Sequence, residues 1–169
     1  MKSVMISIQP KWCELIAAGK KTVEVRKTKP KLEPPFKCYI YCTKKKKPDE
    51  YGPLIFYKDP DGICVENGEG CSPLLTGMVI GEFVCDKIFD ICIEISKPDD
   101  LPGYPFPCTG LTDKEILQYL GNGKAGYGWH ISDLVIYDEP KPLGEFVMAN
   151  TQHYCHLQRP PQSWCYVEG

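Results

Sequence analysis

The chain has 169 residues, of which 43% are hydrophobic and 25% charged, and these values are typical of one soluble globular domain. No apolar run approaches the ~18 residues that a membrane-crossing helix needs, and the first residues alternate too regularly for a signal peptide, so we expect a cytoplasmic protein. Ten cysteines are present without any Cys-x-x-Cys pair, which argues against a zinc ribbon or a thioredoxin-type site. We expect reduced thiols, no metal and no cofactor.

The charge is unevenly distributed along the chain. Residues 1–47 carry 13 lysines and arginines against three acidic residues, a local charge of +10, whereas residues 48–169 carry seven against 19, a local charge of −12. Such asymmetry suggests a polyanionic partner that meets one side of the molecule. The alternative is a solvated lysine-rich face, which is the simplest explanation of the four consecutive lysines at 44–47.

The first part of the chain predicts a strand followed by a helix. Apolar residues alternate over 4–8, which indicates a short strand. Trp12, Leu15 and Ile16 then recur at helical spacing. Gly19 follows them and is typical of the residue that ends a helix.

The next strand, 22–26, carries an unusual set of charges. Two valines point to one face, and Glu24 and Arg26 point to the other. Alternate residues lie ~6.5–7 Å apart along a strand, so Glu24 and Arg26 can pair with each other or hold one ligand jointly, and Lys21 stands at the start of the strand within reach. Burying a lone charge is costly, so these groups either form an ion pair on a half-exposed sheet or line a wet cleft.

The middle of the chain predicts strands on both sides of an insertion. Residues 36–43 form a third strand, and 44–73 turn to Lys, Pro, Gly and acidic residues, which indicates an insertion on a loop. Within it, a hairpin is expected to turn at 61–62. Residues 78–95 give the longest strand pattern, bent or broken near 86–87.

The last third predicts a helix between further strands. Thr112 and Glu115 form a capping box that opens a short helix. Residues 121–128 are expected to form a glycine-rich loop, 129–140 a strand and 164–167 a final strand. Many adjacent strands with few helices favour an α+β fold, a small mixed β-barrel or curved sheet with flanking short helices in a single domain over 1–169.

Aromatic residues are the remaining candidates for ligand contact. Trp12 either fills the core or stacks on a base. Tyr127 and Trp129 follow the expected glycine loop and could stack a base from there, although Trp129 fits equally well as a core residue. His130 could act as an acid or base near neutral pH, but the sequence places no partner beside it.

Several motifs together point to one family. The pattern Gly19-x-Lys21-x-x-Glu24-x-Arg26 resembles the Gly-x-Lys-x-x-Glu-x-Arg signature of the ASCH domain, a branch of the PUA-like superfamily. The segments "ISIQPKWCELIAAGKKTVEVR", "GMVIGEFVCDKI" and "GWHISDLVIYDEPKPLGEF" resemble the opening, the core strand and the tail of that family. The likeness covers most of 4–146, apart from the insertion.

The resemblance implies a small β-barrel and a cleft that binds RNA, single-stranded nucleic acid or a modified nucleoside. Some small ASCH proteins are amidohydrolases on acylated cytidines that use a lysine, a threonine and a glutamate, and others are reported to cut RNA. Lys21 matches the lysine, but Glu24 stands in place of the threonine, so we expect binding first and hydrolysis as the alternative, with Lys21 and Glu24 as its catalytic residues. The expected binding residues are Trp12, Lys20, Lys21, Glu24, Arg26, Lys27, Tyr127, Trp129 and His130.

Overall fold

The computed structural model describes residues 2–44, 76–92, 108–149 and 155–169, together with the backbone of three short strands within 56–74. The helices are α1 (Pro10–Ala17) and α2 (Asp113–Leu120), with a 3-10 turn at Leu143–Glu145. The strands are β1 (Lys2–Ile8), β2 (Val23–Arg26), β3 (Phe36–Cys42), β4 (Phe56–Asp59), β5 (Gly62–Cys64), β6 (Ser72–Leu74), β7 (Val79–Cys85), β8 (Ile88–Cys92), β9 (Ala125–His130), β10 (Ser132–Lys141) and β11 (Trp164–Glu168).

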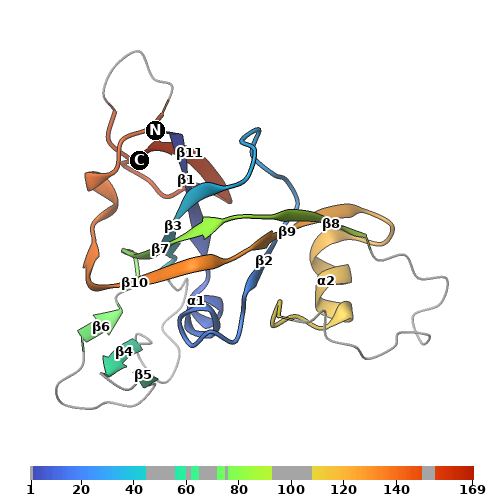
Figure 1. The fold of residues 1–169 in the computed structure, drawn as a ribbon, viewed down its shortest axis with the longest axis horizontal. Helices are drawn as coiled ribbons and strands as arrows, with labels where there is room; N and C mark the ends of the chain where they lie inside the picture. Colours follow the sequence, from blue (N-terminus) through green and yellow to red (C-terminus); the bar gives the residue numbers. More distant parts are fainter. Residues whose placement is uncertain are drawn as a thin grey trace.

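The central sheet has the strand order β10-β7-β3-β1-β11 (Figure 1). β1 pairs parallel with β3 and antiparallel with β11, so the first and last strands lie side by side. β1 is buried on both faces, because Ile6 packs in the main hydrophobic core while Met5 packs in a second core beneath Phe146. This explains why the middle of the strand, residues 4–6, is an unbroken apolar run.

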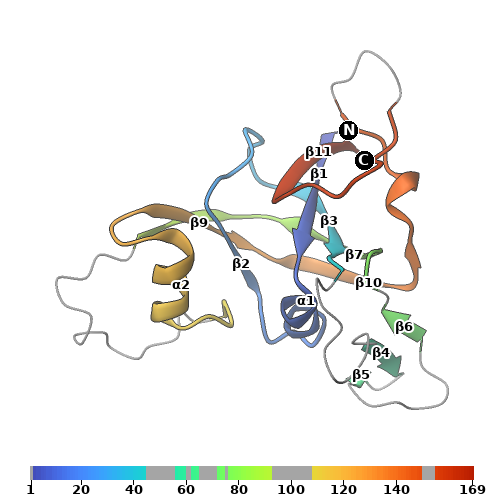
Figure 2. The same ribbon diagram turned by 180° about the vertical axis from the view of Figure 1, so that it is seen from behind.

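A second sheet, β2-β9-β8, carries α2 on one face (Figure 2). Val25 of β2 and Ile91 of β8 pack against Ile116 and Leu120 of α2 in a small separate core. The helix approaches β9 closely because Gly126 has no side chain: a Cβ there would lie 2.5 Å from the Leu120 side chain. Gly126 therefore serves helix–sheet packing, whereas Gly128 makes room for the Phe89 ring of β8.

The local predictions for both helices are confirmed. α1 begins with Pro10 at a position that tolerates proline, and Gly19 follows its end with φ of +68°, a conformation that glycine adopts without strain. α2 begins with the predicted capping box, in which Thr112 accepts from the backbone N–H of Glu115 and the Glu115 side chain accepts from the backbone N–H of Thr112. The predicted break near 86–87 separates β7 from β8.

Two predictions about larger features need correction. The mixed α+β class is confirmed, but a closed barrel is not, because the edge strands β10 and β11 are not paired with each other in the described part of the chain. The glycine-rich loop is also shorter than predicted, since residues 125–128 belong to β9. Tyr127 and Trp129 consequently lie on a rigid strand between two neighbours, β2 and β8.

Most of the predicted insertion at 44–73 lies outside the described residues. Its backbone strands β4 and β5 pair as the expected hairpin, with Asp59 opposite Gly62, so Gly62 belongs to a strand and not to the turn as predicted. Together with β6 they form a small third sheet at the end of the molecule away from α2 (Figures 1 and 2). Within the described ranges, no helix has the length and apolar character needed to span a bilayer.

Candidate nucleotide-binding pocket

The turn between α1 and β2 places Lys21 at the base of a pocket. The backbone N–H groups of Lys20 and Lys21 both donate to the carbonyl of Leu15, at 2.8 and 2.9 Å, so the chain reverses tightly after the helix. The N–H groups of Thr22 and Val23 then donate to the carbonyl of Cys108, which brings a distant segment of the chain against this turn. Lys21 is consequently 2% exposed although it lies at the end of a helix.

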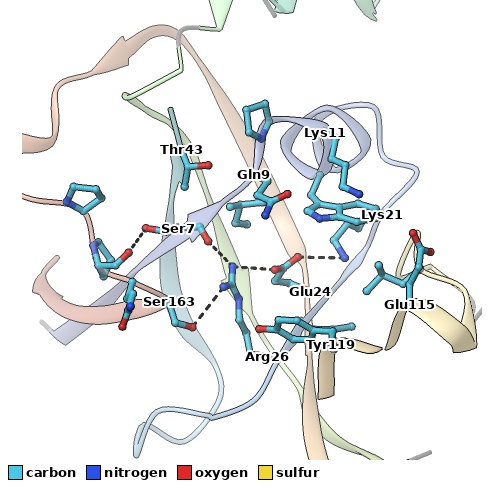
Figure 3. Close-up of a pocket in the computed structure, with 18 of the residues that line it drawn as sticks. Ser7, Gln9, Lys11, Lys21, Glu24, Arg26, Thr43, Glu115, Tyr119 and Ser163 are labelled. Atoms are coloured by element: carbon cyan, nitrogen blue, oxygen red, sulfur yellow. Dashed lines mark hydrogen bonds and ion pairs between the residues drawn. The ribbon is translucent and has the colours of Figure 1, made fainter. Parts of the chain in front are cut away.

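Lys21, Glu24 and Arg26, here called the trio, form a buried chain of charges (Figure 3). Lys21 Nζ lies 3.2 Å from Glu24 Oε2, and Arg26 Nη2 lies 2.9 Å from Glu24 Oε1. The side chains are 1%, 7% and 9% exposed, so the pairs are buried and are not the half-exposed ion pair that the strand pattern also allowed.

Backbone carbonyls complete the surroundings of both cations. Lys21 Nζ donates to the carbonyls of Val23 and Thr109 at 2.8 and 2.6 Å. Arg26 Nη2 donates to the carbonyl of Ser7 at 2.6 Å, and Nη1 makes a longer contact of 3.5 Å with Ser163 Oγ. The trio therefore connects α1 and β2 to β1 and to the segment before β11.

Two polar atoms of the trio lack an assigned hydrogen bond. Among the residues that the structure describes, Glu24 Oε2 and Arg26 Nε are buried without an assigned hydrogen bond, and Glu24 Oε2 keeps its ion-pair contact with Lys21 Nζ at 3.2 Å. An unsatisfied buried polar group costs about 1–3 kcal/mol, and more when it is charged. The trio therefore holds one acceptor atom and one donor atom that make no hydrogen bond within the described part of the chain.

The pocket above the trio has a volume of about 1240 Å³. Its wall is built from the ends of β1 and β3, the first turn of α1, α2 and the segment 160–163. Figure 3 shows Gln9, Lys11 and Thr43 above the trio and Tyr119 below it. Four cationic side chains line the pocket against two carboxylates; the cations are Lys11, Lys21, Arg26 and Lys44, and the carboxylates are Glu24 and Glu115.

Burial lowers the pKa of Lys21, and the neighbouring Glu24 carboxylate acts in the opposite direction. Two carbonyls and a carboxylate around Nζ suit the ammonium form. No group of three His, Cys, Asp or Glu side chains in the described ranges is placed to hold a metal ion.

The structure brings only part of the predicted set of residues together. Trp12 lines the pocket, with Lys11 Nζ 4.1 Å and Lys21 Nζ 5.4 Å from its ring centre. Lys20 and Lys27 are exposed and do not line the pocket, and Lys27 Nζ lies 5.1 Å from the ring centre of Tyr119.

The residues of β9 lie outside the pocket lining. Trp129 is fully buried in the main core, as the alternative interpretation expected, and Tyr127 is partly buried beside it. His130 is half-exposed at the surface, and its Nδ1 lies 2.6 Å from Asp86 Oδ1. The structure therefore gives no support to base stacking by Tyr127 or Trp129 in the same pocket as the trio.

Several pocket residues were absent from the predicted set. Ser7, Ser163 and Tyr119 come from β1, the segment before β11 and α2, which are far apart in the sequence. Only Tyr119 could have been identified from its local sequence, because it is an aromatic residue next to a polar residue in a capped helix.

A second polar cluster lies on the central sheet, outside the pocket lining. Lys37, Glu82 and Tyr137, here called the Glu82 cluster, come from β3, β7 and β10. Glu82 Oε1 accepts from Lys37 at 2.7 Å, and Oε2 accepts from Tyr137 at 2.6 Å. Lys37 and Glu82 are 40% and 23% exposed, so this pair is a natural control for the buried trio.

Comparison with known proteins identifies the family and supports the fold. The family model of the ASCH domain matches residues 6–95, more than half of the chain. A crystal structure of the ASCH protein from Zymomonas mobilis superimposes with a TM-score of 0.60 at 20% identity, over 98% of this chain and 87% of that one. A single-substitution variant of the same protein gives 0.61 at 20% identity, over 99% and 91%. No curated protein sequence matched. At this identity the structures support the fold alone, and the family match establishes that the chain belongs to the ASCH domain family.

Proposed function

We propose that this ASCH domain binds a nucleotide, as part of a single-stranded nucleic acid, with the edge of the base against Glu24 and Arg26. The observation that carries the proposal is that Glu24 and Arg26 line a large pocket and each has a buried polar atom, Oε2 and Nε, without a hydrogen bond. The family match and the basic first third of the chain support the same class of ligand.

The chemistry of these two atoms favours a base over a phosphate at this position. Glu24 Oε2 can only accept a hydrogen bond, and Arg26 Nε can only donate one. The edges of nucleobases present donors and acceptors side by side, whereas an ionised phosphate presents acceptors only and is repelled by a carboxylate. The base therefore faces the trio and the phosphate faces away from it.

The mouth of the pocket suits the rest of a nucleotide. Lys11 and Lys44 are exposed and line the pocket, so each can approach a phosphate without being buried. Trp12 offers a ring within the same lining. Stacking of a base on such a ring contributes about 1–3 kcal/mol.

The test is titration calorimetry with the four nucleoside 5′-monophosphates, together with fluorescence anisotropy of labelled eight-nucleotide RNAs. If Lys11 and Lys44 contact two phosphates, RNA affinity falls about sevenfold between 50 and 200 mM salt, because each contact contributes about 0.7 to the salt slope. Glu24→Gln is expected to weaken mononucleotide binding about tenfold or more, because a hydrogen bond to a charged group is lost.

The matched control is Glu82→Gln, which removes a carboxylate outside the pocket and is expected to leave binding unchanged. Binding that is equal in wild type and Glu24→Gln, or absent for every nucleotide and RNA, contradicts the proposal. Circular dichroism at the titration temperature shows whether each variant is folded.

Hydrolysis in the same pocket is a second candidate. A buried ammonium at Lys21 could stabilise negative charge that develops on a substrate amide or phosphate. Incubation with acylated cytidines and short RNAs compares wild type with Lys21→Ala. Turnover by the wild type that Lys21→Ala abolishes supports this candidate, and no turnover on either substrate class removes it.

A further inference from the structure

Tyr119 forms an exposed aromatic surface at the edge of the pocket. It projects from α2, is 38% exposed and belongs to the pocket lining. Figure 3 shows its side chain reaching from the helix toward Arg26 and Glu24. Lys27, the residue after Arg26, places its Nζ 5.1 Å from the centre of the Tyr119 ring.

The pocket is larger than one base requires. Pockets that enclose a drug-sized ligand have volumes of about 300–1000 Å³, and this one has about 1240 Å³. A base seated against the trio uses the part next to β2. The part next to α2 stays available for a neighbouring group of the same ligand.

We propose that Tyr119 and Lys27 form a second nucleotide subsite, in which the Tyr119 ring stacks on the base adjacent to the one held by the trio and Lys27 contacts the phosphate between them. The inference rests on the proposed function and extends it from one nucleotide to a single strand of two or more. The exposed ring supplies sequence-tolerant stacking, and the exposed lysine supplies a phosphate contact.

The relative strengths of the interactions allow this exchange of partners. A cation–π contact at an exposed site contributes about 0.5–1 kcal/mol, whereas a base stacked on an aromatic ring contributes about 1–3 kcal/mol. A base can therefore replace Lys27 on the ring. Lys27 is exposed and on a flexible stem, so its ammonium can move to the adjacent phosphate.

The helix holds the ring in a fixed position before any ligand arrives. Ile116 and Leu120, which flank Tyr119 on α2, are buried against the second sheet, and the close approach at Gly126 fixes the helix to β9. The capping box also fixes the start of the helix. A preorganised ring costs less entropy on binding than a mobile one.

The experiment compares a mononucleotide with a short strand on the same variants. The probes are the four nucleoside 5′-monophosphates, by calorimetry, and labelled single-stranded tetranucleotides of each base, as RNA and as DNA, by fluorescence anisotropy. Tyr119→Ala is expected to weaken tetranucleotide binding on the order of 5- to 150-fold and to leave mononucleotide binding unchanged. Tyr119→Phe keeps the ring and is expected to keep the affinity.

Lysine variants test the phosphate contact. Lys27→Ala is expected to lower the salt slope of tetranucleotide binding by about 0.7. Lys29→Ala is the matched control, because Lys29 Nζ also lies over a tyrosine, 4.8 Å from the ring centre of Tyr127, but that tyrosine does not line the pocket. Its salt slope is expected to equal that of the wild type.

The outcomes separate the two proposals. Equal tetranucleotide binding by wild type and Tyr119→Ala, with mononucleotide binding intact, overturns the second subsite and leaves the proposed function standing. An equal loss of mononucleotide and tetranucleotide binding in Tyr119→Ala also overturns it, because Tyr119 would then belong to the first site. A wild type that binds none of the probes overturns both proposals.

Discussion

Replacing Glu24 by glutamine tests whether the trio is a buried charge network. Glutamine keeps the length and shape of the side chain and one acceptor oxygen for Arg26, but it removes the negative charge between two cations that are 1% and 9% exposed. Removing one partner of a buried ion pair typically costs 3–5 kcal/mol of stability, whereas an exposed pair contributes about 0–1 kcal/mol.

The structure places the expected cost at the lower end of the buried range. Lys21 keeps its two carbonyl acceptors and Arg26 keeps the carbonyl of Ser7, so neither cation is left without a hydrogen bond. We therefore expect Glu24→Gln to lower the free energy of unfolding by about 3 kcal/mol. Both cations remain near each other without the intervening carboxylate, and this repulsion is the main source of the loss.

The assay is urea unfolding at pH 7, followed by the fluorescence of tryptophan, because Trp129 is fully buried in the main core. The midpoint should fall while the slope with denaturant stays constant, since the surface exposed on unfolding does not change. Glu82→Gln is the control and should lose about 1 kcal/mol or less, because its lysine partner is half-exposed. A loss below about 1 kcal/mol for Glu24→Gln would refute the reasoning, because the trio would then behave as a surface pair.

Three further predictions concern the scaffold. Gly128→Ala should lower stability by about 1–3 kcal/mol in thermal unfolding, because the new Cβ would lie 2.4 Å from the Phe89 ring; an unchanged midpoint would mean that the ring moves aside freely. Burial raises the pKa of Cys85 to about 12, so its thiol should not react at pH 8 in the folded protein. Alkylation of the native protein at pH 8, followed by peptide mass spectrometry, should label exposed Cys108 and leave Cys85 unmodified until denaturant is added. Labelling of Cys85 without denaturant would contradict its burial. Burial tends to raise the pKa of Glu82, but the hydrogen bonds within the Glu82 cluster outweigh burial and hold the folded pKa below the ordinary 4.5. The stability that Glu82 contributes is therefore present above pH 4.5 and is lost as the pH falls through the folded pKa. Glu82→Gln should flatten this acid dependence of stability in urea unfolding, and an acid dependence equal to that of the wild type would contradict the assignment.

Local signals were sufficient to predict the elements that hold the trio. The helix before Gly19 and the capping box at Thr112 depend on neighbours within four residues, so the sequence specifies them directly. The alternation over β2 also placed Glu24 and Arg26 on one face, where both meet the same pocket.

Long-range packing decided the features that the sequence pattern missed. The alternating pattern of β2 does not show whether the face with Glu24 is covered. The segments that line the pocket over this face, 160–163 and α2, come from distant parts of the chain. The glycines of β9 led to the prediction of a loop, because glycine is common in loops. In the structure they lie where the side chains of Phe89 and Leu120 pack closely against the strand. Cys92 is exposed at the end of β8 although its neighbours in the sequence are apolar, so apolar neighbours do not guarantee burial.

The most direct measurement follows the Arg26 Nε–H group by nuclear magnetic resonance. The chain has two arginines, Arg26 and Arg159, so an Arg159→Lys variant assigns the signal. Addition of a nucleoside monophosphate should shift the Arg26 Nε–H resonance and slow its exchange with water, because the free donor gains a base as acceptor. Nucleotide binding that leaves this resonance unchanged while other residues shift would contradict the account.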